Sequence, residues 1–329
     1  MTRNTDQNSS ILITGGCGYL GSQLIRDLVS DVDSNFRIRI LDNLQGKNYQ
    51  ALMNLEGERV YQFIEGDILD PAVVEVALEG VDIVIHLAAI VQTPMSFENQ
   101  TWVNQVNNWG TAGLVEACLD AGVKKFIYAS STAVYGPGGP FLENDVCRPF
   151  GPYAQSKYKA EKHVLSAIDR GLMPVVLRFG TMFGYAPSVR FDAVANRFAY
   201  LAGSKRPLVV FGQGDQVRPF VHISDASTAV RFCMNNFSRT AVQIFNVVGM
   251  NASVLDIVNA VQNSLPEVGV RFTEQDVLTH LSINVSNEKF IKQGWQPIIS
   301  LEDGLRELIM KFSGLEGAFF ESISHNPSV

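Results

Sequence analysis

Short apolar runs alternate with segments of helical periodicity along the first half of the chain. The apolar runs have the length and the β-branched content of buried strands. They cover residues 11–14, 37–41, 61–65, 83–87, 126–129 and 175–179, and the helix-length segments between them cover 19–29, 72–78, 101–121 and 154–168. Strands joined by crossover helices predict an α/β fold with a doubly wound parallel sheet, in which ligands bind at the carboxyl ends of the strands.

The alternation loosens after about residue 180. Further helices are expected at 193–202, 224–235, 254–263 and 301–312, and short strands at 208–211 and 243–247. We therefore expect one domain over residues 1–180 and a smaller α+β lobe over residues 181–329, with some crossing of the chain between the two. The Gly- and Pro-rich segment 136–152 is expected to form a functional or mobile loop.

Composition and charge exclude several classes of protein. Hydrophobic residues make up 46% and charged residues 18%, as in ordinary globular chains. The net charge of −7 supplies no global positive field for nucleic acid or for a membrane surface. The polar start lacks an apolar run behind it, and the four cysteines form no C-x-x-C pair. We expect a soluble, cytoplasmic protein without nucleic-acid or membrane partners.

A glycine-rich turn follows the first expected strand. Gly15, Gly18 and Gly21 have the spacing G-x-x-G-x-x-G. Glycines at these positions let backbone N–H groups and the N-terminus of the next helix approach a pyrophosphate. The spacing alone also suits a tight strand-to-helix turn, so the phosphate interpretation depends on the residues around it.

Acidic side chains follow the second and third expected strands. Asp42 ends the run RIRILD at the place where a carboxylate can accept both ribose hydroxyls of an adenosine. Because a carboxylate repels a 2′-phosphate, Asp42 favours NAD over NADP. The alternative is that Asp42 caps a loop. Asp67 can reach the adenine edge or cap the helix that begins at Pro71, and the sequence leaves both interpretations open.

Tyr153 and Lys157 are four residues apart on an expected helix and therefore share a face. An ammonium group beside a phenol stabilises the phenolate and lowers a pKa that starts at about 10. The hydroxyls of Ser130, Ser131 and Thr132 follow the fifth strand, at the ligand edge of the sheet. Since Y-x-x-x-K is also common on exposed helices, these neighbouring hydroxyls are what favours a catalytic site.

The order of these motifs resembles the extended short-chain dehydrogenase/reductase superfamily, in its NAD-dependent nucleotide-sugar epimerase/dehydratase branch. The resemblance covers nearly the whole chain and implies a Rossmann-type NAD-binding domain with a smaller nucleotide-sugar-binding lobe. Its motifs are the glycine turn, Asp42, His-Leu-Ala-Ala at 86–89, Val-Asn-x-x-Gly-Thr at 106–111, SSTAVYG at 130–136 and YAQSK at 153–157.

The resemblance implies roles for individual residues. Ser131 takes the catalytic hydroxyl position, Tyr153 is the acid/base, and Lys157 binds the nicotinamide ribose while tuning Tyr153. Asn107 takes the place of an asparagine that buttresses the active-site helix. The implied cofactor is NAD, with contacts at Gly15, Gly18, Tyr19, Leu20, Gly21, Asp42, Asn43, Asp67, Ile68, Leu87, Ala88, Ala89, Asn107, Tyr153 and Lys157.

The same resemblance implies that three segments hold a nucleoside-diphosphate sugar, namely 177–184, 208–212 and 218–225. Arg218 suits the diphosphate, because a guanidinium fork matches paired oxygens. The expected substrate contacts are Thr132, Thr181, Arg190, Val209, Phe211 and Arg218. Arg190 is expected because it belongs, with Arg197, Lys205 and Arg206, to a local concentration of positive charge in an acidic protein. His86 and His222 lie in apolar strand-like runs without acidic partners at ligand spacing, so they predict structural roles and no metal site.

Dehydratases of this branch carry acidic residues directly after the catalytic hydroxyl, where this chain has Thr132 and Ala133. We therefore expect an NAD-dependent nucleotide-sugar epimerase that acts at C4 through a transient 4-keto sugar. A 4-keto-sugar reductase or nucleotide-sugar dehydrogenase with the same residues stays open, as does a non-catalytic dinucleotide-sensing or scaffolding protein. We also expect a homodimer. Trp102 and Trp109 lie on a long apolar helix and are expected in the core or at the dimer interface.

Overall fold

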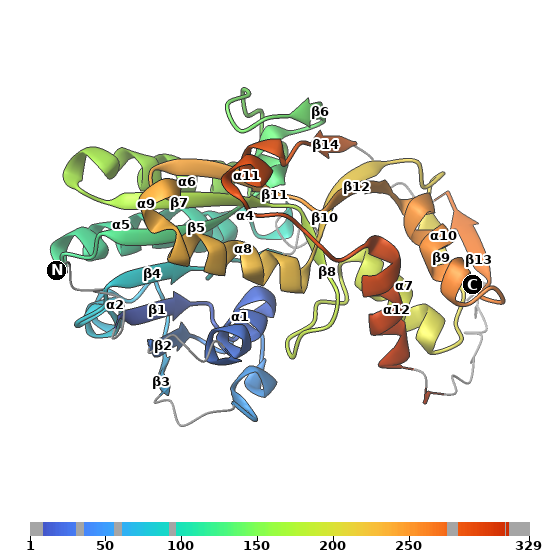
Figure 1. Ribbon diagram of the computed structural model, residues 1–329, viewed down its shortest axis with the longest axis horizontal. Coiled ribbons are helices and arrows are strands. Elements are labelled where there is room, and N and C mark those ends of the chain that lie inside the picture. The colour runs from blue at the N-terminus through green and yellow to red at the C-terminus, as the bar shows by residue number, and fades with distance from the viewer. Residues whose placement is uncertain are drawn as a thin grey trace, which may run out of the picture.

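Seven parallel strands form the main sheet of the protein, seen in a computed structural model that describes residues 9–30, 36–55, 61–91, 97–274, 282–312 and 314–315 (Figure 1). The strand order is β11-β7-β5-β4-β1-β2-β3. The order reverses between β1 and β4, which is where a doubly wound sheet opens its ligand crevice. The predicted fold class is confirmed. The strands are β1 (Ser10–Thr14), β2 (Arg37–Asp42), β3 (Tyr61–Glu65), β4 (Ile83–His86), β5 (Lys125–Ser131), β7 (Met173–Phe179) and β11 (Gln243–Val247).

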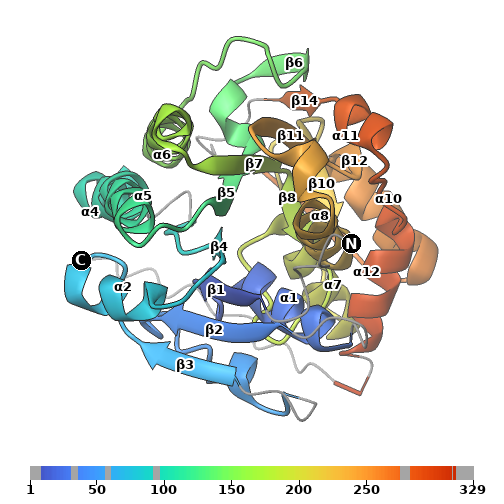
Figure 2. The same cartoon turned by 60° about the vertical axis from the view of Figure 1, so that its left-hand side comes forward.

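Helices cover both faces of this sheet, with α2, α4, α5 and α6 on one side and α1 and α8 on the other (Figure 2). Alternate side chains of β1 explain why: Ile11 and Ile13 pack with the α1 and α8 side, whereas Leu12 packs with the α2, α5 and α6 side. The helices are α1 (Tyr19–Ser30), α2 (Pro71–Leu78), α4 (Gln100–Asn104), α5 (Thr111–Asp120), α6 (Pro152–Ser166) and α8 (Ile223–Asn235).

The single helix expected over residues 101–121 is interrupted. A π-helical turn, Gln105–Gly110, separates α4 from α5. The Thr111 hydroxyl donates to the carbonyl of Asn107 at 2.7 Å, and the Thr111 N–H bonds to Asn108 instead. Because a threonine side chain here competes for a backbone acceptor, the helical ladder is locally rearranged. Asn107 is thereby held in the interrupted turn.

A smaller lobe stands at one end of the main sheet (Figure 1). Its core joins Phe183, Phe198, Phe220, Ile257 and Leu308. It contains the sheet β12-β10-β8, from β8 (Thr181–Phe183), β10 (Val217–His222) and β12 (Met250–Ser253), the pair β9 (Leu208–Phe211) and β13 (Val270–Thr273), and the helices α7 (Val194–Gly203), α10 (Val254–Ser264) and α12 (Leu301–Met310).

The chain crosses between the two units. Three elements that follow residue 181 in sequence belong to the larger unit. The strand β11 is part of the main sheet, and the helices α8 and α11 (Glu288–Gln293) pack in its core. The expected loop 136–152 contains a strand, β6 (Gly138–Phe141), that pairs with β14 (Ile283–Val285). The sequence analysis missed these short strands because each is completed by a partner far along the chain. The remaining short helices are α9 (Phe237–Thr240) and the 3₁₀ turns Tyr49–Leu52, Thr132–Tyr135 and Ile168–Arg170.

Phe290 attaches α11 to the main sheet. Its ring is fully buried and stacks between Phe245, at 4.5 Å, and Trp295, at 4.7 Å between centroids. We predict that Phe290→Ala lowers the free energy of unfolding by about 3 to 5 kcal/mol, because it removes a core aromatic and leaves a cavity. Urea unfolding measures the loss. Phe272→Ala, at a side chain that is 60% exposed, should change stability by less than about 0.5 kcal/mol; equal losses would contradict the assignment.

Candidate active site

Ser131, Tyr153 and Lys157 come together beside the carboxyl end of β5. The Ser131 side chain is near enough to Tyr153 to act on its phenol, whose pKa it lowers. The Lys157 Nζ donates to the backbone oxygen of Ala129 at 2.8 Å and stands 4.9 Å from the ring centroid of Tyr128. Two segments far apart in sequence, the end of β5 and α6, thus supply one cluster, as the resemblance implied.

Burial dominates the electrostatics of this cluster. It lowers the pKa of Lys157 to about 7, while the Glu161 carboxylate acts in the opposite direction. Burial also raises the pKa of Tyr153 above its usual value, against the effects of the Ser131 hydrogen bond and the Arg190 charge. Both groups are therefore sensitive to any charge brought into the site.

The glycine turn packs closely against the segment that follows β4. Gly15 has a φ of +68°, and a Cβ there would lie 2.5 Å from the backbone nitrogen of Ala88. Since only glycine permits this approach, the turn and residues 87–89 line the same crevice at the β1/β4 reversal. The helix α1 begins directly after it, at Tyr19, so its free N–H groups point to this crevice. This arrangement fits the pyrophosphate of a dinucleotide.

Asp42 ties the end of β2 to the glycine turn. Its carboxylate accepts hydrogen bonds from the backbone N–H groups of Cys17 and Leu44, each at 2.9 Å. Asp42 is therefore a loop cap, but an ionised carboxylate has about four acceptor positions, and two remain for ribose hydroxyls. Burial raises the pKa of Asp42 from its usual value.

Asp67 does not cap the helix α2. Asp70 is the N-cap, with its side chain accepting from the Ala72 N–H at 3.0 Å. The Asp67 carboxylate accepts instead from the Leu69 N–H and from the Asn43 amide, each at 2.9 Å. Of the two interpretations that the sequence left open, the helix cap is wrong. Asn43 and Asp67 form a polar pair next to Asp42.

Asn107 joins the segment after β4 to α6. Its amide oxygen accepts from the Ile90 N–H at 2.7 Å, and its amide nitrogen donates to the Ile90 carbonyl and to the Ser156 hydroxyl. Ser156 lies between Tyr153 and Lys157 and donates to the Tyr153 carbonyl at 2.7 Å. The buttress implied by the resemblance therefore has a matching geometry. Ser156, which completes it, was missed in the sequence analysis.

The two strand histidines have structural partners. The His86 ring bonds to the Thr14 and Thr111 hydroxyls, at 2.7 and 2.8 Å. His222 caps α8 by accepting from the Ser224 N–H. Burial lowers the pKa of His222 to about 4 and that of His86 to about 3, so both rings are neutral at physiological pH.

The expected substrate residues lie on the smaller lobe and along its border. Register pairing sets β8, with Thr181, beside β10, with Arg218. Val209 and Phe211 lie on β9. Arg190 forms two contacts with Asp192, at 3.0 and 2.5 Å, and its charge acts on Tyr153. Thr132 is buried, and its hydroxyl donates to the Phe179 carbonyl at 3.2 Å.

Tyr19 connects the glycine turn to the smaller lobe. Its hydroxyl donates to the Gly184 carbonyl and accepts from the Asn196 amide at 3.0 Å. Asn196 also accepts from the Gly184 N–H and donates to the Arg190 carbonyl, each at 2.9 Å. The start of α1 and the segment that carries Arg190 are thereby linked through Asn196. The sequence analysis did not single out Asn196, because a lone buried amide leaves no spacing signal.

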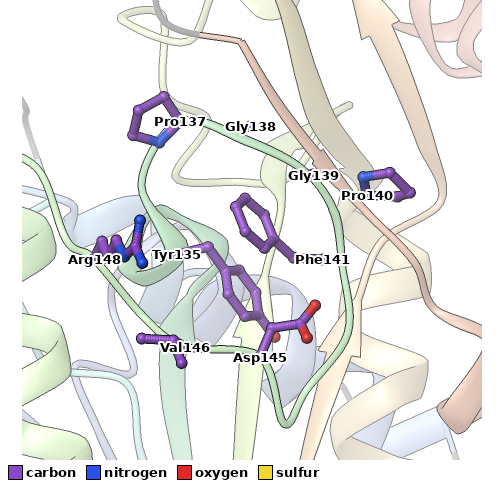
Figure 3. Close-up of a pocket in the computed structure, with 9 residues that line it drawn as sticks. All are labelled: Tyr135, Pro137, Gly138, Gly139, Pro140, Phe141, Asp145, Val146 and Arg148. Atoms are coloured by element: carbon purple, nitrogen blue, oxygen red, sulfur yellow. The ribbon is translucent and has the colours of Figure 1, made fainter.

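A separate cavity of about 460 Å³ lies within the segment 136–152 (Figure 3). Tyr135 and Phe141 stack against each other along its wall, with centroids 5.0 Å apart. None of the expected site residues lines it. Its lining residues are Tyr135, Pro137, Gly138, Gly139, Pro140, Phe141, Asp145, Val146 and Arg148. Over the part of the chain that the structure describes, no helix has the length and hydropathy of a membrane span, and no cluster of side chains suits a metal ion.

Comparison with known proteins gives concordant matches. A family model for the NAD dependent epimerase/dehydratase family matches residues 11–248. The chain is 31% identical over 316 residues to the dTDP-D-glucose 4,6-dehydratase of Mus musculus, covering 91% of this chain and 87% of that protein. It is also 31% identical over 318 residues to an uncharacterized UDP-glucose epimerase of Bacillus subtilis, YtcB, covering 93% of this chain and 98% of that protein.

A solved structure extends the comparison. The UDP-glucuronic acid 4-epimerase from Bacillus cereus, in complex with UDP-glucuronic acid and NAD, matches with a TM-score of 0.82 at 26% identity. The match covers 92% of this chain and 98% of that one. Dehydratases and epimerases are thus both among the similar proteins, and overall similarity does not choose between them.

The position of Asp42 predicts the cofactor preference. We expect Asp42→Ala to weaken NAD binding by about tenfold or more, because it removes a charged hydrogen-bond acceptor. We expect a smaller loss for NADP, because the loop cap is lost for both cofactors but the repulsion of the 2′-phosphate is removed as well. Fluorescence titration of both cofactors measures the two affinities. Asp70→Asn, which keeps a helix cap, is the control and should bind NAD as the wild type does. A wild-type protein that binds NADP as tightly as NAD would contradict the prediction.

Proposed function

Because the chain belongs to the NAD-dependent epimerase/dehydratase family, we propose that it is a nucleotide-sugar epimerase acting at C4 through a transient 4-keto sugar. The observation that carries this proposal is the pair of residues after Ser131. Thr132 is buried with its hydroxyl bonded to the Phe179 carbonyl, and Ala133 has only a methyl group. Neither supplies the acid that would protonate a departing C6 hydroxyl.

Family membership confirms three expectations from the sequence: the resemblance itself, an enzyme, and NAD as the cofactor. It lends no support to the non-catalytic alternative. The intact cluster of Ser131, Tyr153 and Lys157 also argues against that alternative, because a scaffold has no need of it. The reductase or dehydrogenase alternative uses the same residues and is separated from epimerisation by the experiment below.

The proposed roles follow from the positions of the three side chains. Tyr153 accepts the proton of the sugar C4 hydroxyl, and Ser131, whose side chain acts on Tyr153, holds that hydroxyl in line. Lys157, the third member of the cluster, would stabilise the phenolate and bind the cofactor ribose through its ammonium group. The bound cofactor supplies the hydride acceptor and donor for C4. Epimerisation then requires the 4-keto sugar to turn before the hydride returns.

The smaller lobe is proposed to hold the nucleoside diphosphate. Arg218 is partly buried on β10, and burial lowers the pKa of its guanidinium group, so this cation is suited to an anionic ligand. Thr181 on the neighbouring β8, with Val209 and Phe211 on β9, is assigned to the sugar or base. Arg190, beside Tyr153, is assigned to the sugar.

We also propose that the protein is cytoplasmic and forms a homodimer. All four cysteines are free, which suits a reducing, cytoplasmic compartment. Trp109 is 58% exposed, so the core interpretation of this residue is wrong and its place at a homodimer interface is retained.

A redox-neutral reaction is the first expectation. An epimerase reoxidises its cofactor in every turnover, so catalytic NAD suffices and the nicotinamide absorbance shows no net change. We expect one of a panel of UDP-, GDP-, dTDP- and CDP-hexoses, with sub-stoichiometric NAD, to give an inverted C4 proton by NMR. Stoichiometric cofactor consumption would indicate a reductase or dehydrogenase instead. A 4-keto-6-deoxy product would indicate a dehydratase.

Loss of the Tyr153 hydroxyl is the second expectation. Tyr153→Phe should lower turnover by about 10²- to 10⁴-fold while NAD binding is kept, because general acid/base catalysis contributes rate and little cofactor affinity. Steady-state kinetics and NAD titration measure the two quantities. Tyr158→Phe, on the same helix, is the matched control and should turn over like the wild type. Near-normal activity of Tyr153→Phe would refute the assigned chemistry.

A further inference from the structure

Helix α6 carries three chemically active side chains on one face. Tyr153, Lys157 and Glu161 follow each other at intervals of four residues, so they lie one above another along the helix. Lys157 and Glu161 are both buried, at 3% and 1% exposure. A lysine and a glutamate at this spacing ordinarily pair, and the attraction is strengthened by a low-dielectric surrounding. A direct Lys157–Glu161 ion pair is therefore the default arrangement.

The structure has a different pairing. Among the described residues, Lys157 Nζ donates to the Ala129 carbonyl, whereas Glu161 pairs with Arg178. Arg178 reaches both carboxylate oxygens of Glu161, with Nε at 2.9 Å from Oε1 and Nη2 at 2.7 Å from Oε2. The Ser130 hydroxyl donates to Oε1 as well, at 2.5 Å. Three of the roughly four acceptor positions of Glu161 are thus taken by groups other than Lys157.

The sheet places both of these donors. Ser130 on β5 and Arg178 on β7 are register partners, and α6 packs against both strands. The third arm of Arg178, Nη1, donates to the Tyr135 hydroxyl at 2.9 Å and to the Glu143 carbonyl at 3.1 Å. Arg178 is 3% exposed, so its direction is set by these buried bonds rather than by solvent.

Tyr135 extends the network to β11. Its hydroxyl donates to the Asn246 amide oxygen at 2.7 Å, and its ring lies 4.8 Å from the Arg178 guanidinium. The Asn246 N–H in turn donates to the Glu143 carboxylate at 2.9 Å. Bonds to Tyr135 and Glu143 on one side of the Arg178 guanidinium group therefore keep its other two nitrogens directed at Glu161.

We propose that Arg178 is a positioning residue for Lys157: by holding both oxygens of Glu161, it leaves the Lys157 ammonium group available to the cofactor ribose and to Tyr153. The proposal rests on the role of Lys157 in the proposed function. A planar guanidinium outcompetes an ammonium group for a carboxylate because it donates two parallel hydrogen bonds at once. Glu161 still acts on Lys157 through space, by opposing the effect of burial on its pKa.

The test first removes Arg178, which competes with Lys157 for Glu161, and then also removes the charge of Glu161. Arg178→Met frees the carboxylate to capture Lys157, and we expect the dissociation constant for NAD to rise about tenfold or more, the cost of a lost hydrogen bond from a charged group. Adding Glu161→Gln removes the capturing charge while an acceptor for Ser130 remains. The double variant E161Q/R178M should therefore regain NAD affinity to within about threefold of the wild type.

The exposed pair Glu116–Arg170 is the matched control. Its geometry is also bidentate, at 2.6 and 2.7 Å, but its side chains are more than half exposed. Arg170→Met and E116Q/R170M should bind NAD as the wild type does. Thermal unfolding of every variant separates affinity from stability, since a purely structural role makes NAD affinity follow stability across the whole series. NAD is therefore titrated at a temperature at which each variant is fully folded.

Unchanged NAD affinity in R178M, or a double variant as weak as R178M, would overturn the proposal. If R178M does not fold, R178K and E161Q/R178K are compared by the same criterion, because a lysine donates less well to both oxygens and can lose its proton when Glu161 is absent. NAD binding needs no sugar. A failure to find any nucleotide-sugar substrate would therefore count against the proposed function and leave this test intact.

Discussion

The close approach of Gly15 to the backbone of Ala88 is the contact on which the site depends. It brings the turn after β1 against the segment after β4, at the reversal of strand order. Any side chain at Gly15 would meet backbone at 2.5 Å, directly after two neighbouring strands whose positions are fixed by their pairing. The glycine turn, the Asp42 loop cap and the hydrogen bonds of Asn107 are all arranged around this contact.

Two sets of hydrogen bonds fix the position of helix α6, which carries Tyr153 and Lys157. Asn107, in the π-helical turn, is hydrogen-bonded to Ile90 on one side and to Ser156 on the other, so one residue joins the segment after β4 to α6. Further along α6, Glu161 accepts hydrogen bonds from Ser130 on β5 and from Arg178 on β7. Buried polar groups that are fully hydrogen-bonded, as here, rigidify a core instead of weakening it. Lys157 lies between Ser156 and Glu161 along the helix.

Our proposal of an epimerase instead of a dehydratase rests on the two side chains that follow Ser131. Relatives of both kinds match the chain at similar identity, because most of the sequence builds the sheet and the cofactor site that they share. Thr132 and Ala133 are small and lack a carboxyl group, and the Thr132 hydroxyl is directed to β7. The reaction type therefore has to be argued from these positions rather than from overall similarity.

The sequence alone determined what local spacing encodes. The alternation of buried strands and helices predicted the parallel sheet, the glycine spacing predicted the turn, and the interval between Tyr153 and Lys157 predicted a shared helix face. Family resemblance singled out Ser131 and Asn107, and the structure brings Ser131 to Tyr153 and Asn107 to Ser156. These features are readable because each depends on residues that are neighbours along the chain.

Only the tertiary structure decided the partners of buried polar groups. Glu161 follows Lys157 at the spacing of an ion pair, yet it binds Arg178, which reaches it from a strand outside that helix. Asp67 stands before α2 like a helix cap, but Asp70 takes that place and Asp67 binds Asn43. The short strands β6 and β14 need each other from distant parts of the chain. In each case several partners are compatible with local spacing, and the packing of the whole sheet selects one, because a buried charge or N–H group must find its acceptor wherever the fold provides it.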